Sequence, residues 1–156
     1  MSATTEETTV AEDYSLAYAH GTVMVLAWMV FASTGILFSR YGRLLQIGTR
    51  TQLLGEAIWF QAHRFLLTLA SVATLLGFFL VLSQAGGKWV SVADDGPRLF
   101  AHSILGIIVV GLTLIQVWMA LFRCHPDGRF RFIYNRLHRG TGLLALILSV
   151  PTIYLV

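Results

Sequence analysis

The 156-residue chain has little charge, little proline and almost no cysteine. Charged residues make up 12% of it, and it holds one cysteine and three prolines. A single cysteine excludes an intramolecular disulfide and any zinc or iron–sulfur site built from several thiolates. The eleven lysines and arginines are scattered between long apolar runs, which is not the pattern of a nucleic-acid-binding surface, so no nucleic-acid partner is expected. Metal chemistry would depend on histidine or carboxylate.

Apolar residues are abundant instead, at 56% of the sequence and a mean hydropathy of +0.70. A soluble domain of this size cannot bury so large an apolar surplus. A membrane-spanning helix needs about 20 apolar residues, and four runs qualify, at about residues 17–38, 56–83, 99–122 and 134–156. None shows strand-like alternation. The sequence predicts an all-α, membrane-embedded, antiparallel four-helix bundle over residues 17–156, after an acidic tail at 1–16.

The distribution of charge predicts the orientation. Four acidic residues and no basic ones precede the first run, whereas Arg40, Arg43 and Arg50 follow it. The positive-inside rule therefore puts the N-terminus outside. Nine arginines fall at the two predicted inner ends, and only Lys88 and Arg98 fall at the outer loop. An integral multi-pass protein in contact with lipid, with both termini on the outer, non-cytosolic side, is expected.

One histidine stands at or near the start of each apolar run: His20, His63, His102 and His138. In an antiparallel bundle, the first and third runs share a direction, so His20 and His102 lie at the outer level. His63 and His138 then lie at the inner level. Ionisable side chains in a membrane usually turn toward the bundle interior to meet a partner. The sequence therefore predicts two histidine pairs, one near each membrane face.

Two histidines without a nearby carboxylate or thiol leave a tetrahedral zinc site unfilled. Haem fits such a pair, because its porphyrin supplies four ligands and leaves two axial positions. The alternative is a haem-free membrane scaffold or assembly subunit whose histidines only bridge neighbouring helices. Glycines follow the histidines, at positions 21, 106, 111, 140 and 142, and they suit either a macrocycle or close helix packing. A transporter is disfavoured, because all acidic residues lie in tails, links or helix ends.

Several stretches around these histidines resemble the cytochrome b561 family, particularly the b561 module of DOMON-linked, ferric-chelate-reductase-like proteins. They are His20–Met24 with Ala27, Trp28 and Gly35, then Trp59–Arg64, His102–Gly106 and Tyr134–His138 with Gly140. The resemblance implies two haem b groups, with His20 and His102 on the outer iron and His63 and His138 on the inner one. Arg40 looks like the family arginine that closes the first core helix, which can bind a haem propionate or an anionic donor. Positive-inside anchoring explains Arg40 equally well, and Arg64 and Arg139 are weaker cases.

The resemblance also implies transmembrane electron transfer of the ferric-chelate or ascorbate-dependent reductase type. An inner, cytosolic reductant, with ascorbate as one candidate, would supply electrons to an outer acceptor such as ferric iron or a partner haem or redox protein. Ascorbate-using members have lysines shortly before the second histidine, where this chain has Glu56 and Phe60, so the donor stays open. A homodimer through the lipid-facing sides also stays open.

Several aromatic residues could lie between the haems or could be ordinary core and lipid-facing residues. They are Trp28, Trp59, Trp118 and Phe78–Phe79.

Overall fold

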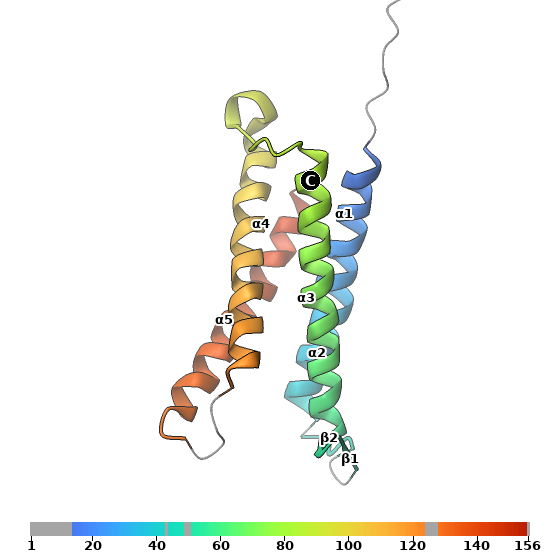
Figure 1. The fold of residues 1–156 in the computed structure, drawn as a ribbon, viewed down its shortest axis with the longest axis vertical. Coiled ribbons are helices and arrows are strands. Elements are labelled where there is room, and N and C mark those ends of the chain that lie inside the picture. Colours follow the sequence, from blue (N-terminus) through green and yellow to red (C-terminus); the bar gives the residue numbers. More distant parts are fainter. Residues whose placement is uncertain (1–13, 43, 49–50, 124–127, 156) are drawn as a thin grey trace, which may run out of the picture.

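The computed structural model describes residues 14–42, 44–48, 51–123 and 128–155, so most of the predicted acidic tail lies outside the described residues. The fold is all-helical, with four helical stretches in chain order (Figure 1). The first stretch alternates between α-helix and π-helix: α1 (Ser15–Val25), η1 (Leu26–Ala32), α2 (Ser33–Leu37) and η2 (Phe38–Gly42). The other three are α3 (Ile58–Gln84), α4 (Val92–Leu121) and α5 (Arg131–Tyr154). The predicted all-α fold of four helices is confirmed.

Three of the described helical stretches are long and apolar enough to cross a membrane: Ser15–Gly42, Ile58–Gln84 and Val92–Leu121. The chain is therefore a multi-pass membrane protein. The predicted fourth span, α5, is long enough, but its composition alone does not identify it as a span. The first half of α5 contains several polar and charged residues, among them Arg131, Arg136 and Arg139.

Two connections differ from the sequence prediction. The link before α3 contains a short hairpin in which β1 (Gln52–Leu53) pairs with β2 (Glu56–Ala57). Its turn residues Leu54 and Gly55 both have positive φ, at 53° and 78°, as a two-residue hairpin turn requires.

The start of α4 also lies earlier than the predicted residue 99. Ser91 caps the helix by accepting hydrogen bonds from the backbone N–H groups of Ala93 and Asp94, at 3.2 Å each. The helix is then interrupted at Gly96, whose φ of 84° and ψ of 162° are non-helical, before it resumes at Pro97. The first turn of α4 was not predicted, because its Gly- and Pro-containing sequence is typical of a loop.

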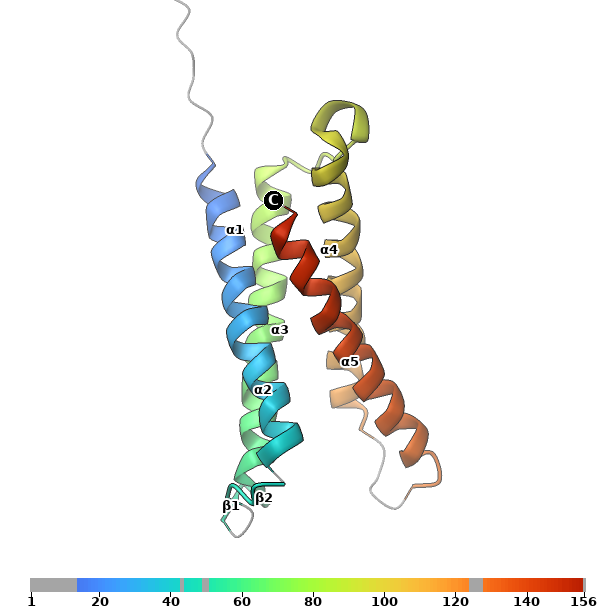
Figure 2. The ribbon, with the colours of Figure 1, turned by 180° about the vertical axis from the view of Figure 1, so that it is seen from behind.

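The four stretches form two antiparallel pairs. Figures 1 and 2 show the first stretch running along α3 and α4 running beside α5, with the start of α1 and the end of α5 at the same end of the bundle. The pairs meet around a small core formed by Ala27, Trp28, Ala32, Ala70, Val109 and Ala145. Alanines there let the helix backbones approach closely.

Large apolar side chains cover the outside of the bundle. Phe79 is 62% exposed and Trp118 is 63% exposed, so both point away from the core, whereas Trp28 is only 7% exposed. A surface of this kind is stable against lipid and costly in water. Of the aromatic residues considered for the space between the two histidine pairs, Trp28 is the one that lies at the bundle centre.

Candidate functional site

The structure brings the four histidines together in the two pairs that the sequence suggested. The ring centroids of His20 and His102 are 6.0 Å apart with an interplanar angle of 79°. Those of His63 and His138 are 6.4 Å apart, also at 79°. Each pair takes one histidine from each helix pair, namely α1 with α4 at one end and α3 with α5 at the other. The two histidine pairs therefore connect the two halves of the bundle.

Three of these histidines are held by a backbone carbonyl of a neighbouring helix. The Nδ1–H group of His20 donates to the Gly77 oxygen at 2.7 Å, and that of His102 donates to the Thr152 oxygen at 2.8 Å. The corresponding bond of His63 goes to the Gly35 oxygen at 3.0 Å. Because a carbonyl oxygen can only accept, Nδ1 carries the proton and Nε2 keeps its lone pair. All three rings are thus fixed in the tautomer that binds a metal through Nε2.

Glycine makes two of these hydrogen bonds possible. A Cβ at Gly35 would lie 2.0 Å from Leu67 Cδ2, and a Cβ at Gly77 would lie 3.0 Å from Met24 Cε. The first helical stretch and α3 can therefore approach closely enough for His63 and His20 to reach the opposite backbone. Sequence reasoning did not give the carbonyls of Gly35, Gly77 and Thr152 this role. The sequence did contain one indication of this role. Glycine lowers the stability of an apolar helix, so its presence there often marks a close contact with another helix.

Gly35→Ala is expected to destabilise the protein by about 1–3 kcal/mol, because the new methyl group overlaps Leu67 and separates the helices. Thermal unfolding in detergent measures the change. Gly111→Ala is the matched control, because a Cβ at Gly111 has nothing within 4 Å among the described residues. Equal stability of the two variants would show that the close contact at Gly35 is unimportant.

The two histidine pairs are separated by a constant length of helix. Fourteen residues separate His63 from Gly77, the partner of His20, on α3. Fourteen also separate His138 from Thr152, the partner of His102, on α5. At 1.5 Å per residue, this places the pairs about 21 Å apart along the bundle.

The first helical stretch needs one more residue to cover that length. Fifteen residues separate His20 from Gly35, which must reach the same two levels of α3. The π-helical segment η1 lies between them and accommodates the extra residue, since a π-helix places more residues in each turn. The π-helix thus keeps both hydrogen bonds between this stretch and α3 in register.

His138 differs from the other three histidines. Its Nδ1 is buried and has no hydrogen-bond partner among the described residues. The ring stacks in parallel on Tyr134, at 5.9 Å and 6°, and the Tyr134 hydroxyl donates to the Met119 carbonyl of α4. The orientation of the His138 ring therefore depends on stacking and on the position of its backbone, and not on a hydrogen bond to a carbonyl group.

The separation of the ring centres in both pairs fits one metal ion between two imidazoles. A metal–imidazole bond is about 2.0–2.1 Å long and the ring centre lies about 1.1 Å beyond the nitrogen, so two coordinating rings are centred about 6.3 Å apart. The observed separations are 6.0 Å and 6.4 Å. The described part of the chain holds no group of three or more potential metal ligands of the His, Cys, Asp or Glu type, so a four-ligand zinc site is incomplete there. Haem, which supplies the other four ligands itself, suits this donor set.

Space beside the histidines also suits a flat macrocycle. A Cβ built at Gly21, Gly106 or Gly140 meets nothing within 4 Å in the described structure. Each of these glycines lies one to four residues after a histidine of the two pairs. These glycines therefore leave the helix surface beside the histidines free of side-chain bulk.

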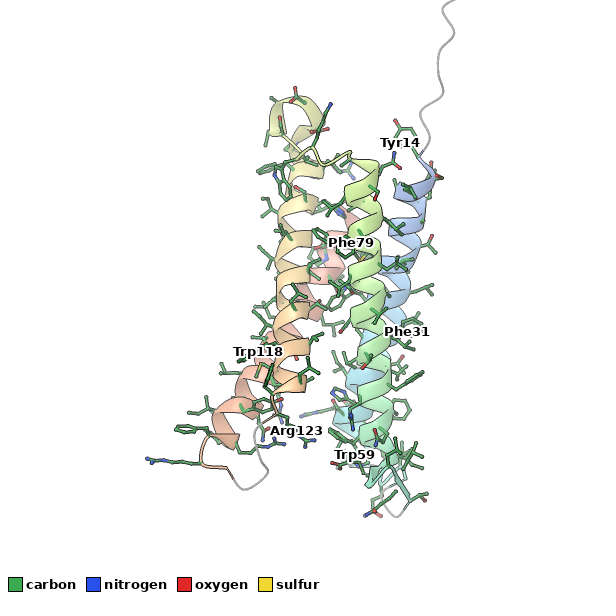
Figure 3. All side chains as sticks on the ribbon, viewed as in Figure 1. Tyr14, Phe31, Trp59, Phe79, Trp118 and Arg123 are labelled. Atoms are coloured by element: carbon green, nitrogen blue, oxygen red, sulfur yellow. The ribbon has the colours of Figure 1, made fainter. Side chains whose placement is uncertain are left out.

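A cation–aromatic cluster adjoins the His63 and His138 pair. The Phe60 ring stacks on His63 with centroids 6.4 Å apart and an angle of 23°. The Arg123 guanidinium lies 4.7 Å from the Phe60 ring centre and 4.0 Å from a Glu56 carboxylate oxygen. Figure 3 places Arg123 at the end of α4, on the side that faces α3, and Trp59 near the start of α3. Sequence reasoning did not assign Arg123 to the site, because its neighbours come from other elements.

The other arginines considered from the sequence are less closely associated with the histidines. Arg40 is exposed in η2 and makes no hydrogen bond or ion pair within the described ranges. Arg64 lies 5.9 Å from the Phe60 ring centre. Arg139 lines a shallow surface depression on α5 with Phe132, Asn135 and Arg136. Only Arg64 therefore shares the Phe60 cluster with Arg123.

The chain matches the family described as Eukaryotic cytochrome b561 over residues 19–156. It is 35% identical over 136 residues to a putative ferric-chelate reductase 1 of Danio rerio, covering 87% of this chain and 22% of the relative. Ferric-chelate reductase 1 of Homo sapiens is 34% identical, with the same coverage. A cytochrome b561 and DOMON domain-containing protein of Arabidopsis thaliana is 24% identical and covered to 26%. The chain thus spans about a fifth to a quarter of the length of these relatives. No solved structure matches it.

Proposed function

Because the chain belongs to the cytochrome b561 family, whose members are typically haem-binding, we propose that it carries electrons across a membrane with two haem b groups. His20 and His102 would hold the outer haem, and His63 and His138 the inner one. The observation that carries the proposal is the two pairs of neighbouring imidazoles, whose ring centroids are 6.0 Å and 6.4 Å apart. When bound, each haem would supply an iron that can accept and release one electron, which is the chemistry that electron transfer needs.

The protein's own residues perform three tasks in this proposal. The Nε2 atoms of the four histidines would hold the two haems, and the carbonyls of Gly35, Gly77 and Thr152 fix three of the rings. The buried core around Trp28 lies between the two pairs and keeps their surroundings mostly apolar. The helices hold the pairs about 21 Å apart, so each lies near one face of a ~30 Å hydrocarbon layer.

We infer the orientation from charge. The end that holds His63 and His138 also holds Arg64, Arg123 and Arg131, whereas Lys88 and Arg98 flank the other end. The positive-inside rule then makes the His63 end cytosolic and places the start of α1 and the end of α5 outside. In this arrangement α5 is the fourth span, and its polar first half lies near the inner membrane surface.

The Arg123 and Phe60 cluster is the proposed contact for an anionic inner reductant, of which ascorbate is one candidate. The Arg123 side chain is 40% exposed, so it can attract an anion, and the Phe60 ring lies between its guanidinium and the stacked His63 ring. Arg64 adds a second positive charge, and Arg40 a third at the same end. The names of the ferric-chelate reductases make ferric iron a candidate outer acceptor. A partner redox protein is the other candidate.

Arg123→Gln is expected to slow reduction by ascorbate roughly 2- to 10-fold, because one charge that steers the anion is lost. Stopped-flow reduction of the haem-loaded protein measures the rate. A neutral hydroquinone should react equally fast with both proteins, and Arg98→Gln, which changes an arginine at the outer end, should leave the ascorbate rate unchanged. If ascorbate reduces Arg123→Gln at the unaltered rate, the donor docks elsewhere.

Proteoliposomes test the proposed function as a whole. With ascorbate trapped inside and ferric citrate outside, vesicles that hold the protein should form ferrous iron outside, and protein-free vesicles should not. The competing function is a haem-free scaffold, whose histidines only connect helices by the hydrogen bonds to Gly35, Gly77 and Thr152. A colourless protein without transmembrane electron transfer would favour the scaffold.

A further inference from the structure

Gln116 of α4 makes a set of contacts with the turn of α5 that carries His138. Its amide Nε2 donates to the His138 carbonyl oxygen at 3.0 Å and to Thr141 Oγ1 at 2.5 Å. The amide also lies flat against Gly142, since a Cβ there would be 3.4 Å from Gln116 Cδ, Nε2 and Oε1 alike. A side-chain amide within an apolar helix is costly unless it finds such partners.

Thr141 makes this contact directional. Its hydroxyl donates to the Leu137 carbonyl at 2.7 Å, so its oxygen is left to accept from Gln116. Gln116 therefore holds α5 at two points, the backbone of His138 and the side chain three residues later. Both points fix how far α5 lies from α4 and how α5 is rotated at the level of His138.

His138 needs such a constraint more than the other three histidines. His20, His63 and His102 each have a carbonyl acceptor for Nδ1, whereas the Nδ1 of His138 has no partner in the described structure. The direction of the His138 ring therefore depends on where its backbone lies and on stacking with Tyr134. Residues that orient a metal-binding imidazole without touching the metal typically change metal affinity 10- to 100-fold when they are mutated.

We infer that Gln116 is a positioning residue for His138: it orients the imidazole that would hold the inner haem and has no such role for the outer one. This inference rests on the proposed function, because it takes His138 as a haem ligand. Gln116 does not touch the His138 ring through any contact given by the structure. It acts through the His138 backbone, Thr141 and Gly142.

Gln116→Leu in the full-length, haem-loaded protein tests this role. The gmax of the two low-spin EPR signals and the loss of haem to excess apomyoglobin are measured, with His63→Ala and His102→Ala used to assign each signal. We expect the inner signal to shift and the inner haem to leave about 10-fold faster, with the outer haem unchanged. Thr113→Val is the matched control, because Thr113 is a buried α4 residue one turn away whose hydroxyl donates to the Val109 carbonyl of its own helix.

Each remaining outcome also decides the matter. An unchanged inner haem overturns the inference, as does an equal change at both haems or the same change in Thr113→Val. If Gln116→Leu does not accumulate, Thr141→Val removes one of the two acceptors, and it should shift the inner signal less but at the same site. No shift there overturns the inference. Unmodified protein without haem would instead overturn the proposed function, together with what rests on it.

Discussion

His63→Ala is expected to leave one haem per chain instead of two and to stop electron transfer across the membrane. His63 faces His138 at 6.4 Å, and only these two imidazoles are present in the described structure to hold a metal at that end of the bundle. With only His138 left to hold it, the inner haem would be lost. Electrons would then have no carrier at the inner end, about 21 Å from the outer histidine pair. Haem quantification and the proteoliposome assay measure the two effects.

The reciprocal variant provides the control. His102→Ala should lose the outer haem and keep the inner one, so the EPR spectra of the two single-haem proteins should add up to that of the unmodified protein. Both variants should keep the helical circular dichroism of the parent, since each loses one side chain among many packing contacts. Two haems retained in His63→Ala would contradict the assignment of His63.

Haem removal is expected to loosen the two helix pairs from each other. The first stretch and α3 are joined by the hydrogen bonds from His20 and His63, and α4 and α5 by those from His102, Gln116 and Tyr134. Between the pairs lies a core of mostly small side chains, and each haem would take one histidine from each pair. A ligand present at 1,000 times its Kd stabilises the state that binds it by about 4.1 kcal/mol.

Spin labels can measure this loosening. One label replaces Val72 of α3 and another Leu114 of α4, which are 60% and 50% exposed, in a Cys124→Ser background. Electron–electron double resonance should give a broader and longer distance distribution without haem. Labels at Val25 and Val72, within one helix pair, should show no change. Identical distributions with and without haem across the two pairs would show that haem does not connect them.

The sequence predicted the features that depend on length, composition and chain direction. Four apolar runs with one histidine each are enough to place His20 beside His102 and His63 beside His138 in any antiparallel bundle, and the structure has those juxtapositions. The register between helices is not readable in this way. The carbonyl partners of the histidines and the contacts of Gln116 depend on which turn of one helix lies against which turn of another.

Local details were missed for similar reasons. The π-helical segment η1 keeps fifteen residues of the first stretch in register with fourteen of α3. The need for a π-helix therefore depends on α3 and cannot be read from the sequence of the first stretch. The Ser91 cap and the Gly96 break concealed one helical turn in a loop-like sequence. Arg40 was selected by resemblance, whereas the described arginines over the Phe60 ring beside His63 are Arg123 and, farther from the ring centre, Arg64.

The most direct test of the central claim is the absorption spectrum of the detergent-purified protein before and after dithionite, with haem quantified per chain. Expression should include added haem precursor, and circular dichroism should show that the protein is folded. Two haems per chain with the sharp reduced α-band of low-spin, bis-histidine b-type iron are predicted. A folded protein with no haem, or with a high-spin spectrum, would contradict the account.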